Sequence, residues 1–181
     1  MIIKFVCLFV LLIVVGCQNS PTKVLEENVN VFGNNTVLVD TRSAFNFVSF
    51  HVPGSVNLNT SDYLILKNPK TSLRILDPDI QQTIERLAKR GINPNKRVIL
   101  LSDSTESVES KKWRWLLRNI EVESVNLMTI AEFKKEYKAR PFAEPKSESS
   151  WTLNTSEDLQ KEFIIKKSKD CFVNWSDKIC K

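Results

Sequence analysis

Cysteine offers the widest range of chemistry in this sequence, and all four cysteines lie near the two ends of the chain. Cys7 and Cys17 belong to an apolar leader, while Cys171 and Cys180 fall in the last eleven residues. A cysteine can be a nucleophile, a metal ligand or half of a disulfide. A metal site needs several thiols or imidazoles close together. Because His51 is the one histidine, we expect no metal ion and no cofactor.

The first seventeen residues are typical of an export signal. Lys4 supplies a positive charge, residues 5–15 form an unbroken apolar run, and a glycine and Cys17 follow. An apolar run of this length suits a secretory signal and is too short to cross a bilayer comfortably. The ending Val14-Val15-Gly16-Cys17 resembles the bacterial lipobox, whose cysteine is diacylated and becomes the first residue of the mature protein.

We therefore predict that residues 1–16 are a lipoprotein signal peptide, that Cys17 is the lipidation site and that residues 17–22 are a tether. Two acyl chains hold a protein stably on a membrane. The expected location is the cell envelope. Since Gln18 rather than aspartate follows the cysteine, the lipobox resemblance implies the outer membrane if the organism has two membranes. An ordinary cleaved signal and an uncleaved anchor helix are the alternatives.

Export gives the two C-terminal cysteines a structural meaning. In an oxidising compartment, Cys171 and Cys180 are expected to form a disulfide. Their spacing is unlike the two-residue gap of thioredoxin-type dithiols. Closing so short a loop stabilises the fold by about 2.5–3 kcal/mol on the chain-entropy model. Residues 172–179 include Phe, Trp and Ile, so this loop either packs on the domain or is offered to a partner.

Composition indicates one globular domain and excludes nucleic-acid binding. Without the leader, the remaining chain is about one domain long, and 42% of the residues are hydrophobic, as in soluble globular proteins. The formal net charge is +5. The basic residues form no compact stripe with interleaved aromatics, which nucleic-acid binding would require.

The middle of the chain alternates strands and helices. The apolar runs 37–39 and 98–101 are typical of strands buried on both faces. Residues 80–88 have helical spacing, a further helix follows residue 107, and residues 122–127 alternate as another strand. One face of the second helix is traced by Val108, Lys112, Trp115, Leu116 and Asn119. This order predicts an α/β sandwich with a central, mostly parallel sheet, whose functional loops follow the two buried strands.

Residues 37–58 resemble the first signature of the rhodanese family of sulfurtransferases. Members read apolar-apolar-Asp-x-Arg and then Gly-His-Ile-Pro-Gly-Ala, and here the matching residues are Asp40, Arg42, His51, Pro53 and Gly54. The residue before the histidine is phenylalanine instead of glycine.

The resemblance covers roughly residues 23–142, which we predict to be a rhodanese-like domain with a three-layer fold. It implies that Asp40 and Arg42 are a structural pair and that His51 is a buried, hydrogen-bonded imidazole.

The resemblance fails at the loop that carries the chemistry in this family. Active members have a cysteine after the second buried strand, in a loop that lowers the thiol pKa so that the thiolate can hold a persulfide. Here the loop reads Ser102, Asp103, Ser104, Thr105, Glu106 and Ser107. A serine cannot form a persulfide. The two carboxylates disfavour an anion such as thiosulfate, although acids at a helix start also complement its dipole.

The remaining residues, 143–181, are predicted to be a C-terminal extension. Residues 139–150 are a polar linker with two prolines, and Thr155-Ser156-Glu157-Asp158 is typical of a helix start. The extension is too short for a second rhodanese domain, so the catalytic half of two-domain members does not follow.

We therefore expect a membrane-anchored, non-catalytic rhodanese-like protein that binds a protein partner in the cell envelope. The alternative is an active sulfurtransferase or thiol-dependent enzyme with another nucleophile, such as a reduced Cys171 or Cys180. A third possibility is a structural envelope component in which the fold is a spacer.

Overall fold

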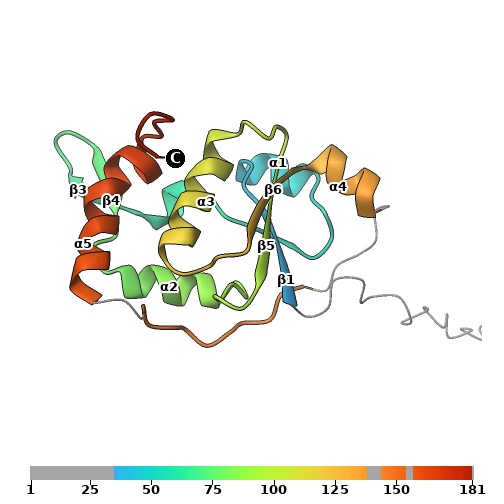
Figure 1. Cartoon of the computed structure of the whole chain (residues 1–181). Coiled ribbons are helices and arrows are strands. Elements are labelled where there is room, and N and C mark those ends of the chain that lie inside the picture. The colour runs from blue at the N-terminus through green and yellow to red at the C-terminus, as the bar shows by residue number, and fades with distance from the viewer. Residues whose placement is uncertain (1–34, 138–143, 154–156, 181) are drawn as a thin grey trace, which may run out of the picture.

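The computed structural model describes residues 35–137, 144–153 and 157–180 (Figure 1). Its elements in chain order are β1 (Thr36–Asp40), α1 (Ala44–Ser49), β2 (Ser55–Asn57), the 3-10 helix η3 (Thr60–Tyr63), β3 (Leu64–Asn68), β4 (Leu73–Leu76), α2 (Ile80–Ala88), β5 (Arg97–Ser102), α3 (Val108–Asn119), β6 (Val125–Thr129), α4 (Ile130–Tyr137), α5 (Glu157–Ser168) and the π-helical turn η4 (Lys169–Val173).

The centre of the molecule is a parallel sheet of four strands in the order β2-β1-β5-β6. Residues 37–39 of β1 and 98–101 of β5 are at most 2% exposed. These apolar runs are continuous because side chains on both faces of a covered parallel sheet are buried. The predicted α/β sandwich with a central parallel sheet is therefore confirmed.

Helices cover the two faces of the sheet unequally. The larger apolar core joins Val37, Val39 and their neighbours on β5 to side chains of α2, α3, α5 and η4. The smaller core joins Leu38 and Ile99 to Phe133 and Tyr137 of α4. These are the layers of the sandwich, and α4 lies at the opposite end of the molecule from α5 (Figure 1).

Helix α2 begins and ends where its sequence predicts. The side chain of Asp79 accepts hydrogen bonds from the first-turn amides of the helix. Gly91 follows the helix with a φ of +81°, a conformation that suits glycine. A Cβ on this glycine would also collide with Pro145, which packs over the helix end. The linker after the domain is therefore held against it, and Lys96 forms an ion pair with Glu148 at 2.7 Å.

Two details of the expected elements differ. Strand β6 begins at Val125 rather than at Val122, because the Val122 amide donates to the carbonyl of Leu117 and completes the end of α3. The buried stripe of α3 consists of Ser110, Trp113, Leu116 and Leu117. Val108, on the face that the sequence traced, is 46% exposed. The buried stripe is rotated around the helix from the expected face and shares only Leu116 with it, because Trp113 fills the core between the sheet and the extension.

The C-terminal extension supplies part of the core. Leu153, Ile164 and Phe172 are almost fully buried in the larger apolar core. The ring of Phe172 meets the edge of Trp113 with the ring centroids 5.1 Å apart. Phe172 thus packs on the domain, which is the first of the two alternatives for the loop between the terminal cysteines.

A disulfide joins Cys171 to Cys180, the pair expected from the sequence, with their Cα atoms 5.4 Å apart. The signal peptide, Cys17 and the tether lie outside the described residues. Within the described part of the chain, no helix is both long and apolar enough to cross a bilayer.

Candidate functional site

The carboxyl ends of β1 and β5 bring the two predicted loops together. The amide and the hydroxyl of Thr41 both donate to the carbonyl of Leu101, each at 3.0 Å. The Thr41 hydroxyl also lies 2.7 Å from that of Ser110, on α3. The start of the first loop is therefore fixed to the end of β5 and to the helix behind it.

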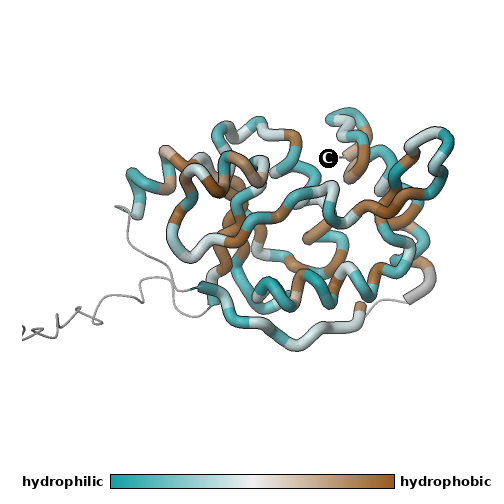
Figure 2. The backbone as a smooth tube through the Cα atoms, turned by 180° about the vertical axis from the view of Figure 1, so that it is seen from behind, coloured by the Kyte–Doolittle hydropathy of each residue, from teal (hydrophilic) through white to brown (hydrophobic). Residues whose placement is uncertain are grey.

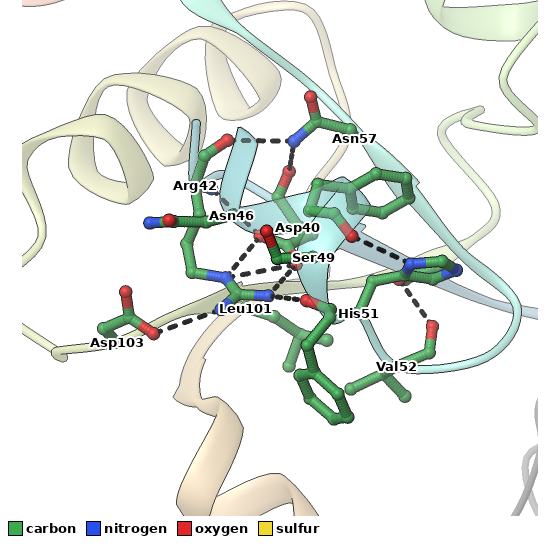
Figure 3. Close-up of polar contacts among 12 residues, drawn as sticks. Asp40, Arg42, Asn46, Ser49, His51, Val52, Asn57, Leu101 and Asp103 are labelled. Carbon is green, nitrogen blue, oxygen red and sulfur yellow. Dashed lines mark hydrogen bonds and ion pairs between the residues drawn. The ribbon is translucent and has the colours of Figure 1, made fainter. Parts of the chain in front are cut away.

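Arg42 and Asp40 form the most buried ion pair at this end of the sheet (Figure 3). The Asp40 side chain is fully buried, and its Oδ2 accepts from Nη2 of Arg42 at 2.8 Å. Nε of Arg42 donates to both carboxylate oxygens. The hydrogen bond to Asp40, assisted by the charge of that carboxylate, raises the pKa of Arg42. A buried carboxylate needs such partners because water no longer solvates it.

Arg42 also connects the signature loop to the loop after β5. Its Nη2 donates to the carbonyl of Phe50 at 2.6 Å, and its Nη1 lies 3.4 Å from Oδ1 of Asp103. Asn57 closes the other side of the turn by donating to the carbonyls of Asp40 and Arg42, both at 2.9 Å (Figure 3). One guanidinium thus fixes three chain segments, which is a positioning role.

Ser102, the residue in the expected nucleophile position, is turned into the loop. Its side chain is buried, and its hydroxyl donates to the carbonyl of Ser104 at 2.8 Å. The Ser104 hydroxyl accepts from the amide of Glu106 at 3.2 Å, and the Ser107 hydroxyl caps α3. The loop is therefore folded around its own hydroxyl groups. Among the described residues, no hydrogen bond joins the Ser102 hydroxyl to an imidazole or a carboxylate, so no base is in place to take its proton.

The rest of the loop carries exposed charge that is tied to the C-terminal extension. Lys111 on α3 donates to Glu106 at 2.6 Å and lies 3.4 Å from Asp177, between the disulfide-bonded cysteines. The hydrogen bond to Glu106 raises the pKa of Lys111. The disulfide-closed segment thus borders the loop that follows β5.

His51 is exposed, so the expectation of a buried imidazole is wrong. Its Nδ1 lies 2.9 Å from the carbonyl of Phe47, and its ring stacks on that of Phe47 with the centroids 4.3 Å apart. The difference arises because α1 buries none of its residues, and the histidine follows the residue that caps the end of this helix, Phe50. The neighbouring Pro53 is exposed as well, and Gly54 has a φ of +81° in the turn before β2.

Residues 24–140 match the family model described as a rhodanese-like domain. The chain belongs to the rhodanese-like family. This match covers more than half of the sequence and nearly the same residues as the predicted domain. No curated protein matches the sequence significantly.

The rhodanese-like domain offers no cluster of metal ligands in its described part. Across residues 35–137, 144–153 and 157–180, no three His, Cys, Asp or Glu side chains come together in a way that could hold a metal ion. The expectation that the protein uses no metal or cofactor stays a prediction.

One feature of the site was not predicted from the sequence, an apolar surface on α1. Phe45 and Val48 are 79% and 81% exposed, and Phe50 just after the helix is 47% exposed. The spacing of Phe45 and Val48 places them on one face of the helix. Val108, which opens α3 after the loop, is exposed too. The apolar letters of residues 45–50 are visible in the sequence, but only the fold shows that they face outward.

Proposed function

We propose that this rhodanese-like protein is a lipid-anchored, non-catalytic module that binds a protein partner in the cell envelope. The observation that carries the proposal is Ser102. At the position where active members carry their cysteine, this chain has a buried hydroxyl that is hydrogen-bonded to Ser104. A hydroxyl without a base is a weak nucleophile and cannot carry sulfur as a persulfide.

The charges around the loop support the same conclusion. Asp103 and Glu106 are exposed carboxylates, and the cations near them, Arg42 and Lys111, are already paired with carboxylates. An anionic sulfur donor would meet negative charge and few free donors here. The loop is held by hydrogen bonds among its own residues, and a loop of fixed shape suits a binding surface.

The surface that we assign to the partner consists of Phe45, Val48 and Phe50, together with the loop 102–107. Isolated exposed apolar residues are common on proteins, but several on one short helix beside the family's functional loop are typical of a protein contact. Aromatic residues are the side chains that most often dominate such contacts. Exposed charges at Asp103 and Glu106 would form the polar rim.

The membrane anchor rests on the leader sequence. The apolar run 5–15 followed by Gly16-Cys17 supports export and lipidation. The disulfide between Cys171 and Cys180 fits an oxidising compartment outside the cytoplasm. The alternative enzyme would need one of these two sulfurs as a free thiolate. The disulfide, with cysteines that are 1% and 5% exposed, weighs against it.

The first test is thiosulfate-to-cyanide sulfur transfer by the purified full-length protein, with an active rhodanese as the positive control. We expect no turnover above the uncatalysed rate. Turnover that persists after Cys171 and Cys180 are both changed to serine would overturn the non-catalytic assignment. Turnover that disappears in this double variant would establish the thiol enzyme instead.

The second test is crosslinking in cells with a photoreactive amino acid in place of Phe45 or Val48. We expect one discrete crosslinked protein from both positions, and loss of that product when the other apolar residue is changed to aspartate. The matched control is the same photoreactive amino acid in place of Glu85, an exposed residue on α2. Equal products from the control position, or none from α1, would contradict a partner site on this helix.

A further inference from the structure

The β3–β4 hairpin is the second apolar surface of the molecule, and the proposed function does not use it. Leu66 is 52% exposed, Leu73 is 44% exposed and Ile65 is 40% exposed. Ile65 pairs with Ile75 across the hairpin, and Leu66 pairs with Arg74. Directly opposed residues share a face and successive residues alternate. Exposed apolar groups therefore lie on both faces, so the outer half of the hairpin projects from the domain.

The same segment carries only positive charge. Lys67, Lys70 and Arg74 are the charged residues between positions 64 and 76, and all three are exposed. No acidic side chain pairs with any of them in the part of the chain that the structure describes. By contrast, Lys111 and Lys112 on α3 are each paired with a glutamate. The hairpin thus leaves three cations open to an external anionic partner.

The turn holds this arrangement in place. Asn68 accepts from the amide of Lys70 at 2.9 Å through its side chain, and Ser72 has a φ of +52° before β4 begins. A residue other than glycine is strained at a positive φ, so the structure around the turn must hold Ser72 in this conformation. The three cations are consequently presented around the apolar groups of the hairpin rather than spread over the domain.

Helix α5 extends the apolar surface. It packs on β4, and it lies beside the hairpin at one end of the molecule (Figure 1). Leu159 and Phe163, one helical turn apart, are 69% and 44% exposed, and Lys166 is exposed on the following turn. In Figure 2, apolar and polar segments adjoin each other at this end of the tube. The result is an apolar surface bordered mainly by lysine and arginine, with the exposed carboxylate of Glu162 as the acidic group on this face of α5 among the described residues.

We propose that the β3–β4 hairpin, with the exposed side of α5, docks on an anionic lipid surface. Interfacial protein segments combine large apolar groups, which enter the headgroup region, with Lys and Arg, which meet the lipid phosphates. Acidic protein surfaces would satisfy the cations but not the apolar groups on both faces of a projecting hairpin. A bilayer satisfies both at once.

This docking is compatible with a lipid at Cys17, although it does not require one. Seventeen residues lie between Cys17 and Asn35, where the described chain begins. At about 3.3–3.6 Å per residue, this stretch can span at most roughly 60 Å. A domain of this size is about 40 Å across. The stretch between Cys17 and the domain is therefore long enough for the hairpin to face the membrane, although β1 starts at a distance from the hairpin (Figure 1).

The test places an environment-sensitive fluorescent amino acid at position 66 of the full-length protein bound to vesicles. With phosphatidylglycerol in the vesicles, we expect a blue-shifted emission that brominated lipid quenches. With phosphatidylcholine alone, and for the same probe in place of Glu85, the emission should stay as in water. Reversal of three charges, K67E/K70E/R74E, should lower the ratio of docked to undocked hairpin by at least roughly a hundredfold, since the loss of each cation alone accounts for about fivefold.

A matched charge reversal on other elements, K89E/R118E/K135E, controls for net charge and should leave the docked fraction unchanged. If the protein floats with vesicles while the probe stays in water, docking by the hairpin is wrong and anchoring through Cys17 stands. If the protein does not float, both are wrong. A photoreactive group at position 66 that captures a protein in cells, and no lipid, would overturn the lipid assignment in favour of a protein contact.

Discussion

The guanidinium of Arg42 covers the fully buried carboxylate of Asp40 and continues to the carbonyl of Phe50 and to Asp103. This pair is the part of the family signature that the structure explains most directly. Asp40 ends β1, and its charge can be buried only because the residue two positions later returns to neutralise it. The pair fixes the backbone between the end of β1 and the loop that follows β5.

Removal of Arg42 should therefore destabilise the fold. We expect Arg42→Ala to lower the free energy of unfolding by about 3 kcal/mol, since it leaves a buried carboxylate without its cation. Arg42→Lys should recover only part of this stability, because one ammonium cannot reach both the Asp40 carboxylate and the Phe50 carbonyl. Urea unfolding measures both. Arg118→Ala is the control and should stay within about 0.5 kcal/mol of the unsubstituted protein; an equal loss in the control would refute the argument.

A cysteine introduced at position 102 should be a poorly accessible thiol. Ser102 is 2% exposed and its hydroxyl points at the carbonyl of Ser104. We expect the Ser102→Cys thiol to react with iodoacetamide at least about tenfold more slowly than the thiol of Thr105→Cys, on the exposed part of the same loop. The unsubstituted protein gives the background rate. Similar rates for both variants would show that the loop opens far more readily than its hydrogen bonds imply.

The sequence predicts the parts of this fold whose burial is decided locally. Strands β1 and β5 are apolar at every central position, and α2 carries both its helical spacing and its capping Asp79. Such signals need no knowledge of the partner element. The position of Ser102 at the end of a buried strand follows in the same way, from the chain order and the carboxyl-end rule.

The missed features depend on contacts between distant segments. Strands β3 and β4 of the hairpin are five and four residues long, and the elements that pack on β4, α5 and η4, follow more than eighty residues later. The exposure of His51 depends on how α1 sits on the domain, which its six residues do not specify. The contact of Phe172 with Trp113 likewise joins positions that no local pattern connects.

Phe172 tests whether the C-terminal extension belongs to the folded domain. The match to the family ends at residue 140, yet the Phe172 side chain is fully buried against Trp113. We expect Phe172→Ala to lower the free energy of unfolding by about 3–5 kcal/mol through the cavity that it leaves. Ile179→Ala, at a half-exposed position of the same segment, should cost no more than about 0.5 kcal/mol. Similar small effects at both positions would mean that the extension is detached in solution.

The disulfide should contribute to stability through the chain that it closes. We expect Cys171→Ser/Cys180→Ser to lower the free energy of unfolding by about 2.5–3 kcal/mol on the chain-entropy model. Reduction followed by alkylation of the unsubstituted protein should give a similar loss. Thermal unfolding under non-reducing conditions measures the stability of the oxidised protein, the double variant and the alkylated protein. No difference between the oxidised protein and the double variant would show that the buried contacts of Phe172 alone hold the segment.

Glu132 gives the fold a specific sensitivity to acid. Its carboxylate accepts from the amide and the hydroxyl of Thr129, both at 2.8 Å, while the Glu132 amide donates back to Thr129 at 3.1 Å, so the pair caps α4. The bond from the Thr129 amide, and then that from its hydroxyl, lower the pKa of Glu132 below its ordinary value of 4.5. A group whose pKa is lower in the folded state stabilises the fold above its unfolded pKa, and this stabilisation is lost as the pH falls through the folded pKa.

We therefore expect Glu132→Gln to lose stability at pH 7 and to lose less on acidification below about pH 4.5 than the unsubstituted protein does. Urea unfolding at a series of pH values from 7 to 3 measures the difference between the two curves. Glu123→Gln, at an exposed position before β6, is the matched control and should run parallel to the unsubstituted protein. If the Glu132→Gln curve runs parallel as well, the cap does not draw on the ionised carboxylate. In that case the two Thr129 donors are satisfied by water or by the neutral amide equally well.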